Sequence, residues 1–390
     1  MARRAYKFRF YPTDDQKQLL ARTFGCVRVV YNTILKWRQD QYKEYGKSIG
    51  FSLASAKLTE IKKDPELSWL KGVSCVPLQQ CLRHQQKAFD NFFAGRAQFP
   101  KFKKKHGHQS CEFTRSAFKY RDGQLFMAKS KEPLNIRWSR EVPSNPSTVT
   151  ISKDRSGRYF VSLLCEFEAK PMPITPNMVG IDLGLKDLYI TDKGFKSGNP
   201  RHTQRYEKKL AVLQRRLAKK KKGSNNRNKA RLKVARLHAK IADCRSDATH
   251  KASRKLINEN QVVCLESLKV KNMIKHPTLA KHIADANWGE FVRQLKYKAD
   301  WAGREVIQID QWFPSTKTCS CCGHVVDEMP LNQRWFSCPK CKNEIDRDTN
   351  AGRNILTAGL AGRACGATGT GKVVKPPSRE GVMKQEDLFR

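Results

Sequence analysis

The sequence predicts a multidomain α+β protein that carries a small cysteine-rich insertion. Its 390 residues, 39% of them hydrophobic, are enough for two or three domains. Stretches with the two-residue alternation of strands and stretches with helical spacing follow one another in separate blocks along the chain. Two C-x2-C pairs stand close together towards the C-terminal end, at the spacing of a metal-bound module.

The first predicted element is a strand, and a long helix follows it. Tyr6, Phe8 and Phe10 alternate with basic residues, which is the period of a half-buried strand, and a proline ends it. Thr13 and Gln16 then form a capping-box pattern, which predicts the start of a helix. Helical spacing continues, with breaks, to about residue 94.

A basic loop, "FPKFKKKHGH", comes next. It begins at Phe99 and holds a second aromatic residue, Phe102, between lysines. The two rings could stack on nucleobases, or they could be buried beneath a neighbouring domain. The sequence leaves both interpretations open.

The pattern returns to strands from about residue 110 to about residue 170. There, "STVTIS" and "GRYFVSLLCEFE" flank turn residues Asp154 to Gly157, which predicts a hairpin in a small barrel or sheet. The proline-rich "KPMPITP" at 170–176 predicts a domain boundary.

The chain as a whole is strongly basic. Lys and Arg total 76 against 36 Asp and Glu, which gives a formal net charge of +40. Soluble domains usually carry a net charge of roughly 2 to 8, and a larger excess repels itself unless it faces a polyanion. The charge therefore predicts a nucleic acid partner.

The cysteines predict a reduced, cytoplasmic protein. The start "MARRAYKFRFYP" never becomes an apolar run, and no apolar stretch of about 18 residues follows it. Disulfides belong to oxidising compartments, so the cysteines scattered outside the C-terminal cluster are expected to be small apolar side chains.

A strongly basic segment covers residues 201–255, with 20 Lys or Arg and three acidic residues. Apolar residues recur in it at helical spacing in two runs, which "KKKKGSNNRN" separates. The pattern predicts a helical hairpin whose outer face contacts phosphates, with a merely solubilising role as the alternative. The predicted apolar seam consists of Tyr206, Leu210, Leu213, Leu217, Val234, Leu237 and Ile241.

The last residues, from about 366 to 390, lack periodicity and are predicted to be disordered. Their "GATGTGK" resembles a phosphate-binding loop only superficially. Its spacing differs from that of the phosphate-binding motif, and no strand precedes it.

Four cysteines at metal-ligand spacing form a highly specific local motif. Each C-x2-C pair lets two thiolates meet one ion, and the longer gap between the pairs lets them complete a tetrahedron, as structural Zn²⁺ requires. Cys321 could replace Cys322, but Gly323 suits a tight turn directly after Cys322. Since sulfur would fill every position, the ion should hold structure and not catalyse. The predicted zinc ligands are Cys319, Cys322, Cys338 and Cys341.

Three acidic residues stand at positions where a carboxylate needs a partner. Asp182 lies within the apolar strand predicted at 179–183, and Glu266 ends another at 262–265. Asp348 begins the last predicted helix. A buried carboxylate costs several kcal/mol unless it is paired, protonated or bound to a cation. We therefore expect the three to converge on a cation.

A strand Asp, a distant strand Glu and a helix-borne Asp are the ingredients of an RNase H-type nuclease site. There, two Mg²⁺ ions about 3.5 to 4 Å apart activate water and stabilise the leaving oxygen. Oxygen ligands select Mg²⁺ or Mn²⁺. Three carboxylates within about 4 Å repel by roughly 4 kcal/mol per pair, so metal is needed to hold them together. Glu344 and Asp346 are expected behind this site or at the surface.

Other interpretations exist for single motifs. "GIDLG" also opens the phosphate-binding strand of actin-like and sugar-kinase ATPases, and Glu266 alone could be a surface acid at a strand end. The nuclease hypothesis is favoured by the conjunction of three acids in order, the basic hairpin, the cysteine module and the net charge of +40.

These residues resemble the OrfB/TnpB family of insertion-sequence proteins, which are relatives of the type V CRISPR effector nucleases. The resemblance covers about residues 3 to 362. In "DRDTNAG" the family's catalytic position corresponds to Asp348 and not to Asp346. One departure is Thr316 in "FPSTK", where Ser is common. The matching motifs are "GCVRVVYN", "FPKFKKK", "GIDLGL", "LESL", "FPSTKTCSCCG" and "DRDTNAGRNI".

The resemblance implies an RNA-guided DNA endonuclease of the prokaryotic nucleoid. A guide RNA derived from the element's end would pair with double-stranded DNA beside a short flanking motif, and one RuvC-like site would cut both strands. The implied domains are a wedge β-barrel (1–11 and 107–170), a helical recognition domain (12–106), a RuvC-like nuclease domain (174–312 and 345–365) and an inserted zinc ribbon (313–344). The alternatives are a strand-transfer transposase that uses the same acids, and a catalytically inactive RNA- or DNA-binding repressor.

Overall fold

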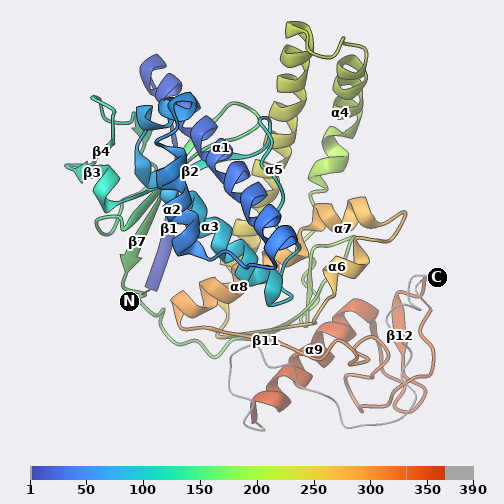
Figure 1. The fold of residues 1–390 in the computed structure, drawn as a ribbon. Coiled ribbons are helices and arrows are strands. Elements are labelled where there is room, and N and C mark those ends of the chain that lie inside the picture. Colours follow the sequence, from blue (N-terminus) through green and yellow to red (C-terminus); the bar gives the residue numbers. More distant parts are fainter. Residues whose placement is uncertain (1, 331, 365–390) are drawn as a thin grey trace. The chain divides into compact units, whose positions relative to one another are not determined.

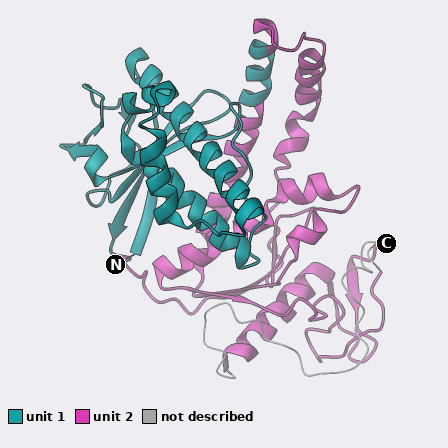
Figure 2. Cartoon of the chain, viewed as in Figure 1, with its two compact units in different colours: residues 1–168, 228–236 teal, residues 169–227, 237–390 magenta. Residues whose placement is uncertain are grey.

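The computed structural model describes residues 2–330 and 332–364, and the predicted disordered tail (366–390) lies outside these residues. Its contacts divide the chain into two compact units (Figure 2). The first consists of Met1–Glu168 with Asn228–Arg236, and the second of Ala169–Arg227 with Leu237–Arg390. Among the helices that the structure describes, none is long and apolar enough to cross a bilayer.

The first unit contains a five-stranded sheet in the order β2-β6-β7-β1-β5, with every pair antiparallel. Along β1 the aromatic side chains predicted to face inward are buried, and the predicted hairpin between β6 and β7 is confirmed. No pairing joins β2 to β5 among the described strands, so closure into a wedge barrel stays a prediction. The strands are β1 (Ala2–Phe10), β2 (Gln109–Thr114), β5 (Ile136–Arg137), β6 (Thr148–Lys153) and β7 (Tyr159–Phe167), and a separate hairpin joins β3 (Phe118–Arg121) to β4 (Gln124–Met127).

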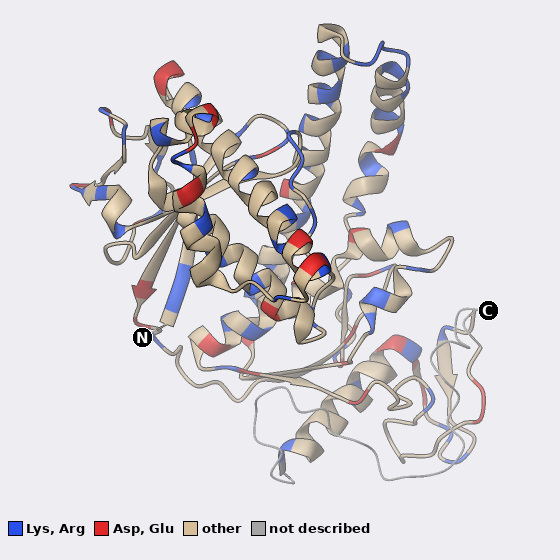
Figure 3. Ribbon diagram, in the orientation of Figure 1, with Lys and Arg blue, Asp and Glu red and all other residues tan. Residues whose placement is uncertain are grey.

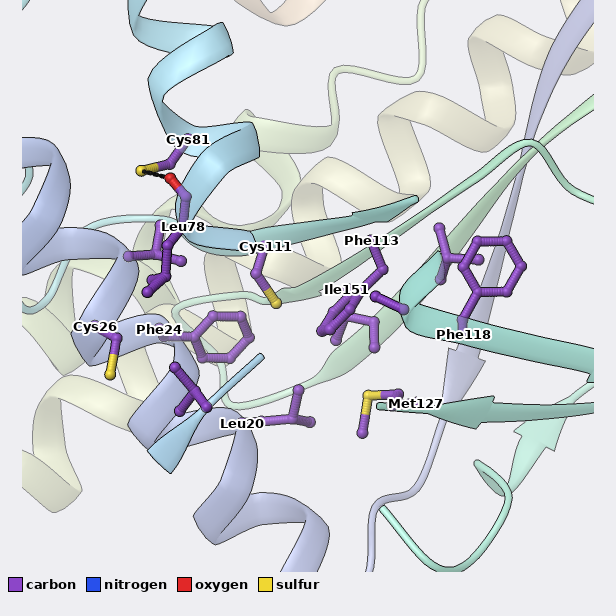
Figure 4. Close-up of a cluster of buried hydrophobic side chains, with 14 of the residues drawn as sticks. Leu20, Phe24, Cys26, Leu78, Cys81, Cys111, Phe113, Phe118, Met127 and Ile151 are labelled. Carbon is purple, nitrogen blue, oxygen red and sulfur yellow. Dashed lines mark hydrogen bonds between the residues drawn. The ribbon is translucent and has the colours of Figure 1, made fainter. Parts of the chain in front are cut away.

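Helices pack on this sheet from the segment between β1 and β2 (Figure 1). The capping box at the start of α1 is confirmed, because Thr13 and Gln16 exchange side-chain and backbone hydrogen bonds. Leu20 and Phe24 of α1 reach the same core as Phe113 of β2 (Figure 4). The helical elements are α1 (Asp14–Tyr45), α2 (Phe51–Ile61), the 3₁₀ turn η1 (Pro65–Gly72), α3 (Cys75–Phe93) and the short η2 (Arg115–Ala117).

Most of the scattered cysteines are buried apolar side chains, as predicted. Cys81 and Cys111 lie in this core (Figure 4), and burial raises the pKa of the Cys81 thiol to about 12. The Cys81 Sγ lies 3.0 Å from the Leu78 carbonyl oxygen. Cys75, at the start of α3, is exposed and departs from the prediction.

The second unit is built on a four-stranded sheet in the order β11-β10-β8-β9. β8, β10 and β11 are parallel to one another, and β9 runs antiparallel to β8. The carboxyl ends of the three parallel strands therefore meet at one edge of the sheet. The strands are β8 (Met178–Asp182), β9 (Ile190–Thr191), β10 (Val262–Leu265) and β11 (Glu305–Gln308).

Helices cover both faces of this sheet. Val263 and Leu265 of β10 share a core with Phe291 of α8, and Val262 and Cys264 share another with the last helix, α9. Figure 1 shows α8 and α9 on opposite sides of β11. The helices of this unit are α6 (Val270–Met273), α7 (Ala280–Ala286), α8 (Trp288–Ala302) and α9 (Arg347–Ala364), and a short ladder pairs β12 (Trp335–Ser337) with β13 (Glu344–Asp346).

The predicted basic helices are confirmed as α4 (His202–Ala218) and α5 (Asn225–Glu259). Lys and Arg are distributed along both (Figure 3). Leu237 and Ile241 of the predicted seam are buried, whereas no residue of α4 is fully buried. Lys240 of α5 lies 5.3 Å from the centre of the Tyr206 ring of α4.

Candidate functional site

Two of the predicted acids stand side by side at the carboxyl edge of the second sheet. Asp182 is the last residue of β8, and Glu266 directly follows β10. The parallel register pairs Leu265 with Ile181, so Glu266 comes next to Asp182. Side chains alternate along a strand, and Val262 and Cys264 face α9. The same alternation directs Glu266 towards the face that α9 covers.

Asp182 and Glu266 share a hydrogen bond, and the charge of Asp348 also acts on Asp182, although the ligand atoms of the three carboxylates do not all lie within 4.8 Å of one another. Burial raises the pKa of Asp182 well above its usual range, and the charges of Glu266 and Asp348 and a hydrogen bond with Glu266 raise it further. Burial raises the pKa of Glu266 to about 7, although hydrogen bonds to Leu183 and Asp182 act against it. Two such carboxyl groups hold a shared proton or take up a cation. Asp182 is thus electrostatically coupled to both of the other predicted acids.

Asp348 lies in the first turn of α9, and Asp346 caps that helix. The Asp346 Oδ1 accepts hydrogen bonds of 3.1 Å from the backbone N–H groups of Asp348 and Thr349, and its Oδ2 pairs with Lys196 Nζ at 2.9 Å. Burial would raise the pKa of Asp346, but the bonds with Lys196 and Thr349 bring it below its usual value. Asp346 is therefore the N-cap residue of α9. Glu344, on β13, is exposed.

Glycines let α9 lie directly on the sheet. A Cβ on Gly180 of β8 would overlap the carbonyl oxygen of Gly352 and would lie 2.7 Å from the backbone nitrogen of Leu356. A Cβ on Gly352 would lie 2.8 Å from the backbone nitrogen of Asp192. Gly359 meets Cys264 of β10 just as closely, since a Cβ added to that glycine would lie 3.0 Å from the Cβ of Cys264. None of these glycine contacts was predicted from the sequence, although Gly180 lies two residues before Asp182 and Gly352 four residues after Asp348.

Arginine side chains contact Asp348 in this structure. The Nε and Nη2 atoms of Arg347 both lie 3.2 Å from the Asp348 Oδ1, and an Arg334 nitrogen lies 4.0 Å from its Oδ2. The positive charge of Arg347 also opposes the rise in the pKa of Asp182. The sequence analysis missed both arginines, and only the position of Arg347 beside Asp348 could have indicated a role.

The predicted cysteines come together within the second unit. Their four sulfur atoms all lie within 4.8 Å of one another. No other group of three or more His, Cys, Asp or Glu side chains meets this distance within residues 2–330 and 332–364. The three carboxylates are not such a group, and Asp348 is paired with arginine in this structure. The closest sulfur pairs, Cys319 with Cys341 and Cys322 with Cys338, are each 3.6 Å apart. Sulfurs bound tetrahedrally at about 2.3 Å from Zn²⁺ lie about 3.8 Å from one another, so the cysteines fit that ion.

Two similar turns present these cysteines. Gly323 donates its N–H to the Cys319 carbonyl at 2.9 Å with φ of +72°, so the prediction of a tight turn there is confirmed. In the second turn, Lys342 donates to the Cys338 carbonyl at 2.9 Å with φ of +58°. Cys321 is exposed and lies outside the cluster, as predicted. Backbone N–H groups of Cys341 and Lys340 lower the pKa of Cys338 to about 6, which favours the thiolate that a metal binds.

Two asparagines attach the first turn to α9. The Asn350 side chain accepts the Ser320 N–H at 2.9 Å and donates to the Thr318 carbonyl at 2.7 Å. Asn354 donates to the carbonyl oxygens of Ser315 and Thr318 at 2.8 and 2.6 Å. Both asparagines are buried. The cysteine cluster and Asp348, two residues before Asn350, therefore share one rigid support.

Comparison with known proteins identifies the family. The model OrfB_IS605, described as "Probable transposase", matches residues 161–276, and a model of the Cas12f1-like TNB domain matches residues 288–355. A protein of Streptomyces pristinaespiralis named "Putative RNA-guided DNA endonuclease" is 52% identical over 93% of this chain and 91% of its own. The chain belongs to the OrfB/TnpB family. A family member of Escherichia coli K12 with the same description, InsQ, is 33% identical over 93% of this chain and 94% of its own.

Two solved structures share the fold of this chain. A Cas12f1 from a complex with sgRNA and target DNA aligns with a TM-score of 0.55 at 14% identity, over 88% of this chain and 83% of that one. The mini-RNA-guided endonuclease Cas_phi3 aligns with a TM-score of 0.52 at 8% identity, over 92% of each chain. The predicted family and the multidomain α+β fold are thus confirmed. A helix-turn-helix model of the family matches residues 1–47, where the described residues form strand β1 and the single helix α1.

Proposed function

We propose that this chain is an RNA-guided endonuclease that cuts double-stranded DNA beside a short flanking motif. The observation that carries the proposal is the coupling of Asp182 with both Glu266 and Asp348 at one edge of an α/β sheet. The full-length relatives named as RNA-guided DNA endonucleases support it. The three acids would hold Mg²⁺ or Mn²⁺, which carboxylate oxygens prefer.

The acids and the arginines would have different roles at this site. Asp182 and Glu266 would bind the ions as neighbours on the sheet edge, and α9 would bring Asp348 as the third ligand. Two divalent ions supply an activated water and stabilise the leaving oxygen of the phosphodiester. The guanidinium groups of Arg347 and Arg334 would turn from Asp348 to a DNA phosphate once the acids are neutralised. The hydrogen-bonded start of α9 would keep Asp348 in place.

The remaining parts of the chain would bind the nucleic acids. The basic faces of α4 and α5 would contact phosphates of a guide RNA derived from the end of the mobile element. Pairing of guide and target would read the sequence, and the wedge (1–11 and 107–170) and the helical segment (12–106) would hold the guide and read the flanking motif. The four cysteines would bind one structural Zn²⁺ in the ribbon (313–344), inserted in a RuvC-like domain (174–312 and 345–365). The enzyme would act at the nucleoid.

The proposal is tested by expressing the gene with its downstream DNA. RNA that copurifies is sequenced, and a plasmid library with a matching target and randomised flanks is offered with Mg²⁺. We expect guided double-strand cuts, which Asp182→Ala abolishes while RNA still copurifies. Glu344→Gln, an exposed acid four residues before Asp348, is the matched control and should cut normally. Guided cutting by the Asp182 variant at the wild-type rate would refute the proposal.

Two other functions remain as outcomes of the same experiment. The description of the family model favours a strand-transfer transposase with the same acids, which would join donor to target DNA in vitro. The pairing of Asp348 with Arg347 would also suit a repressor with an inactive site. A repressor would bind nucleic acid equally well with Glu266→Gln and would not cut at any Mg²⁺ concentration.

A further inference from the structure

Aromatic rings are exposed at the end of α3 and in the loop that follows it. Phe93 is 72% exposed, Phe99 39% and Phe102 48%. Phenylalanine side chains are usually buried. Several exposed rings close together mark an interaction site more often than a single exposed ring does. We call the surface formed by these three rings with Arg96, Lys101, Lys104 and Lys105 the aromatic loop surface.

Two rings of this surface, Phe93 and Phe99, pack against other phenylalanines of the first unit. Phe99 meets Phe89 and Phe92 edge to face, with ring centres 5.5 and 5.3 Å apart. Phe93 lies 5.3 Å from Phe92 and is stacked 6.3 Å from Phe89. Phe89 itself is buried in the core of the first unit. Phe93 and Phe99 therefore extend a packed cluster outward and are held in place before any ligand binds.

The loop is clamped so that Phe102 faces outward. The side-chain amide of Asn32 in α1 accepts the backbone N–H of Lys103 at 2.8 Å and donates to its carbonyl oxygen at 3.0 Å. The Lys103 ammonium lies 4.5 Å from the centre of the Tyr31 ring, and Pro100 is buried. Residues 100 and 103 thus point inward, while Phe102 lies between them on the exposed side. Because the backbone next to Phe102 is already held by Asn32, less conformational entropy of the loop is lost when a ligand binds this ring.

Charge on this surface selects the chemical class of ligand. Residues 91–111 contain five Lys or Arg and no acidic residue, and the acids that flank this stretch are Asp90 of α3, which is exposed, and Glu112 of β2. Among residues 93–105, Gln98 is the one uncharged side chain with an amide or hydroxyl group. Lysines beside flat apolar rings suit phosphates and unpaired bases, which is how proteins bind single strands without reading sequence. The lysines and the arginine could donate to a ribose 2′-hydroxyl, but Gln98 is the one side chain of residues 93–105 that could accept a hydrogen bond from it, which favours DNA over RNA.

We propose that the aromatic loop surface binds an unpaired DNA strand by stacking its bases on Phe93, Phe99 and Phe102, while the lysines contact the phosphates. Guided opening of a duplex displaces such a strand, and to that extent the inference rests on the proposed function. The stacking itself requires neither a guide nor the three acids.

The test compares the purified chain's affinity for three labelled oligonucleotides by fluorescence anisotropy. These are a single DNA strand of about 16 nucleotides, an abasic DNA of the same length, and the corresponding RNA. Salt of about 0.3 M weakens phosphate contacts over the whole basic chain, so base stacking contributes a larger share of the remaining affinity. Abasic DNA keeps the phosphates and removes the bases, so the ratio of the two DNA affinities reports base stacking alone.

We expect the wild type to bind the base-containing strand about tenfold or more tightly than abasic DNA, since each stacked base contributes substantially. The double variant Phe93→Ala, Phe102→Ala should lose this preference, and Phe102→Trp should retain it. Tyr42→Ala is the matched control, because that ring is 66% exposed but lies between Asp40 and Glu44. Thermal melting verifies that the variants are folded.

Several results would overturn the inference. An equal loss of affinity for normal and abasic DNA in the double variant would mean that the rings do not stack on bases. A ring-dependent preference for RNA over DNA would assign the surface to RNA. Self-association in sedimentation velocity that the double variant abolishes would assign it to a second copy of the chain. Wild-type protein that fails to cut guided targets but prefers strands with bases would refute the proposed function and leave the stacking surface intact.

Discussion

Gly180 of β8 lies directly against Gly352 of α9, with no room for a side chain between strand and helix. Asp182 is two residues beyond the first glycine, and Asp348 is one helical turn before the second. The crossing of the two backbones therefore sets the distance between two acids that are far apart in the sequence. Burial and charge couple these same acids.

Substituting Gly180 with alanine should destabilise the protein and suppress cutting. The added Cβ would overlap the Gly352 carbonyl, and the backbones must then separate. Overpacking of this kind costs about 1–3 kcal/mol, and α9 would carry Asp348 away from the sheet edge. Denaturant unfolding and plasmid cleavage measure the two effects. The control is Gly289→Ala in α8, where a Cβ meets nothing within 4 Å, and wild-type behaviour of both variants would contradict this account.

Zinc content should depend on Cys322 and not on Cys321. Both cysteines are exposed, but the Cys322 sulfur lies 3.6 Å from that of Cys338 within the cluster, and Cys321 is not part of it. Wild-type protein and Cys321→Ser should contain about one Zn²⁺ per chain by mass spectrometry of the metal, and Cys322→Ser should lose it. If Cys321→Ser lost the ion instead, the first turn would present the other thiol.

Asn350→Ala should reduce cleavage while zinc stays bound. The change leaves the Ser320 N–H and the Thr318 carbonyl without the Asn350 side chain, although Asn354 still donates to Thr318. An unsatisfied buried group costs about 1–3 kcal/mol. The start of α9 should loosen, which lowers the cleavage rate. Normal zinc content with normal cleavage would show that the ribbon does not support Asp348.

Acid should remove a stabilising contribution that Asp285 makes at neutral pH. Burial acts to raise the pKa of this carboxyl, but hydrogen bonds from Thr203 and Arg245 bring it below its usual value of 3.8. A carboxyl with a lowered folded-state pKa stabilises the fold above its unfolded-state pKa, and that stability is lost as the pH falls through the folded value.

The Asp285→Asn variant provides the measurement. At pH about 7 it should be less stable than the wild type by about 2 kcal/mol, because hydrogen bonds to a charged group are lost. The difference should shrink below pH about 4, where the wild-type carboxyl takes up a proton. Unfolding curves across this range test it, and a difference that does not change with pH would exclude the ionised carboxyl as its source.

Local features of the fold follow from the sequence alone. The capping box at Thr13, the hairpin around Asp154 to Gly157 and the tight turn at Gly323 depend on residues within a few positions of each other. Hydrogen bonds over such short separations are set by the local order of residue types. The strands that carry Asp182 and precede Glu266 were predictable for the same reason.

Other features required the tertiary structure. Nothing near Gly180 in the sequence indicates that Gly352 will lie against it, and nothing near Asp348 indicates the bond to Thr318 that Asn350 makes. The exposure of Phe99 and Phe102 was also undecided, because the clamp on their loop comes from Asn32 in another helix. Such contacts join segments far apart in the chain, and their energy exists only once the core has brought those segments together. The sequence determined which acids, cysteines and rings were available, and packing decided which of them meet.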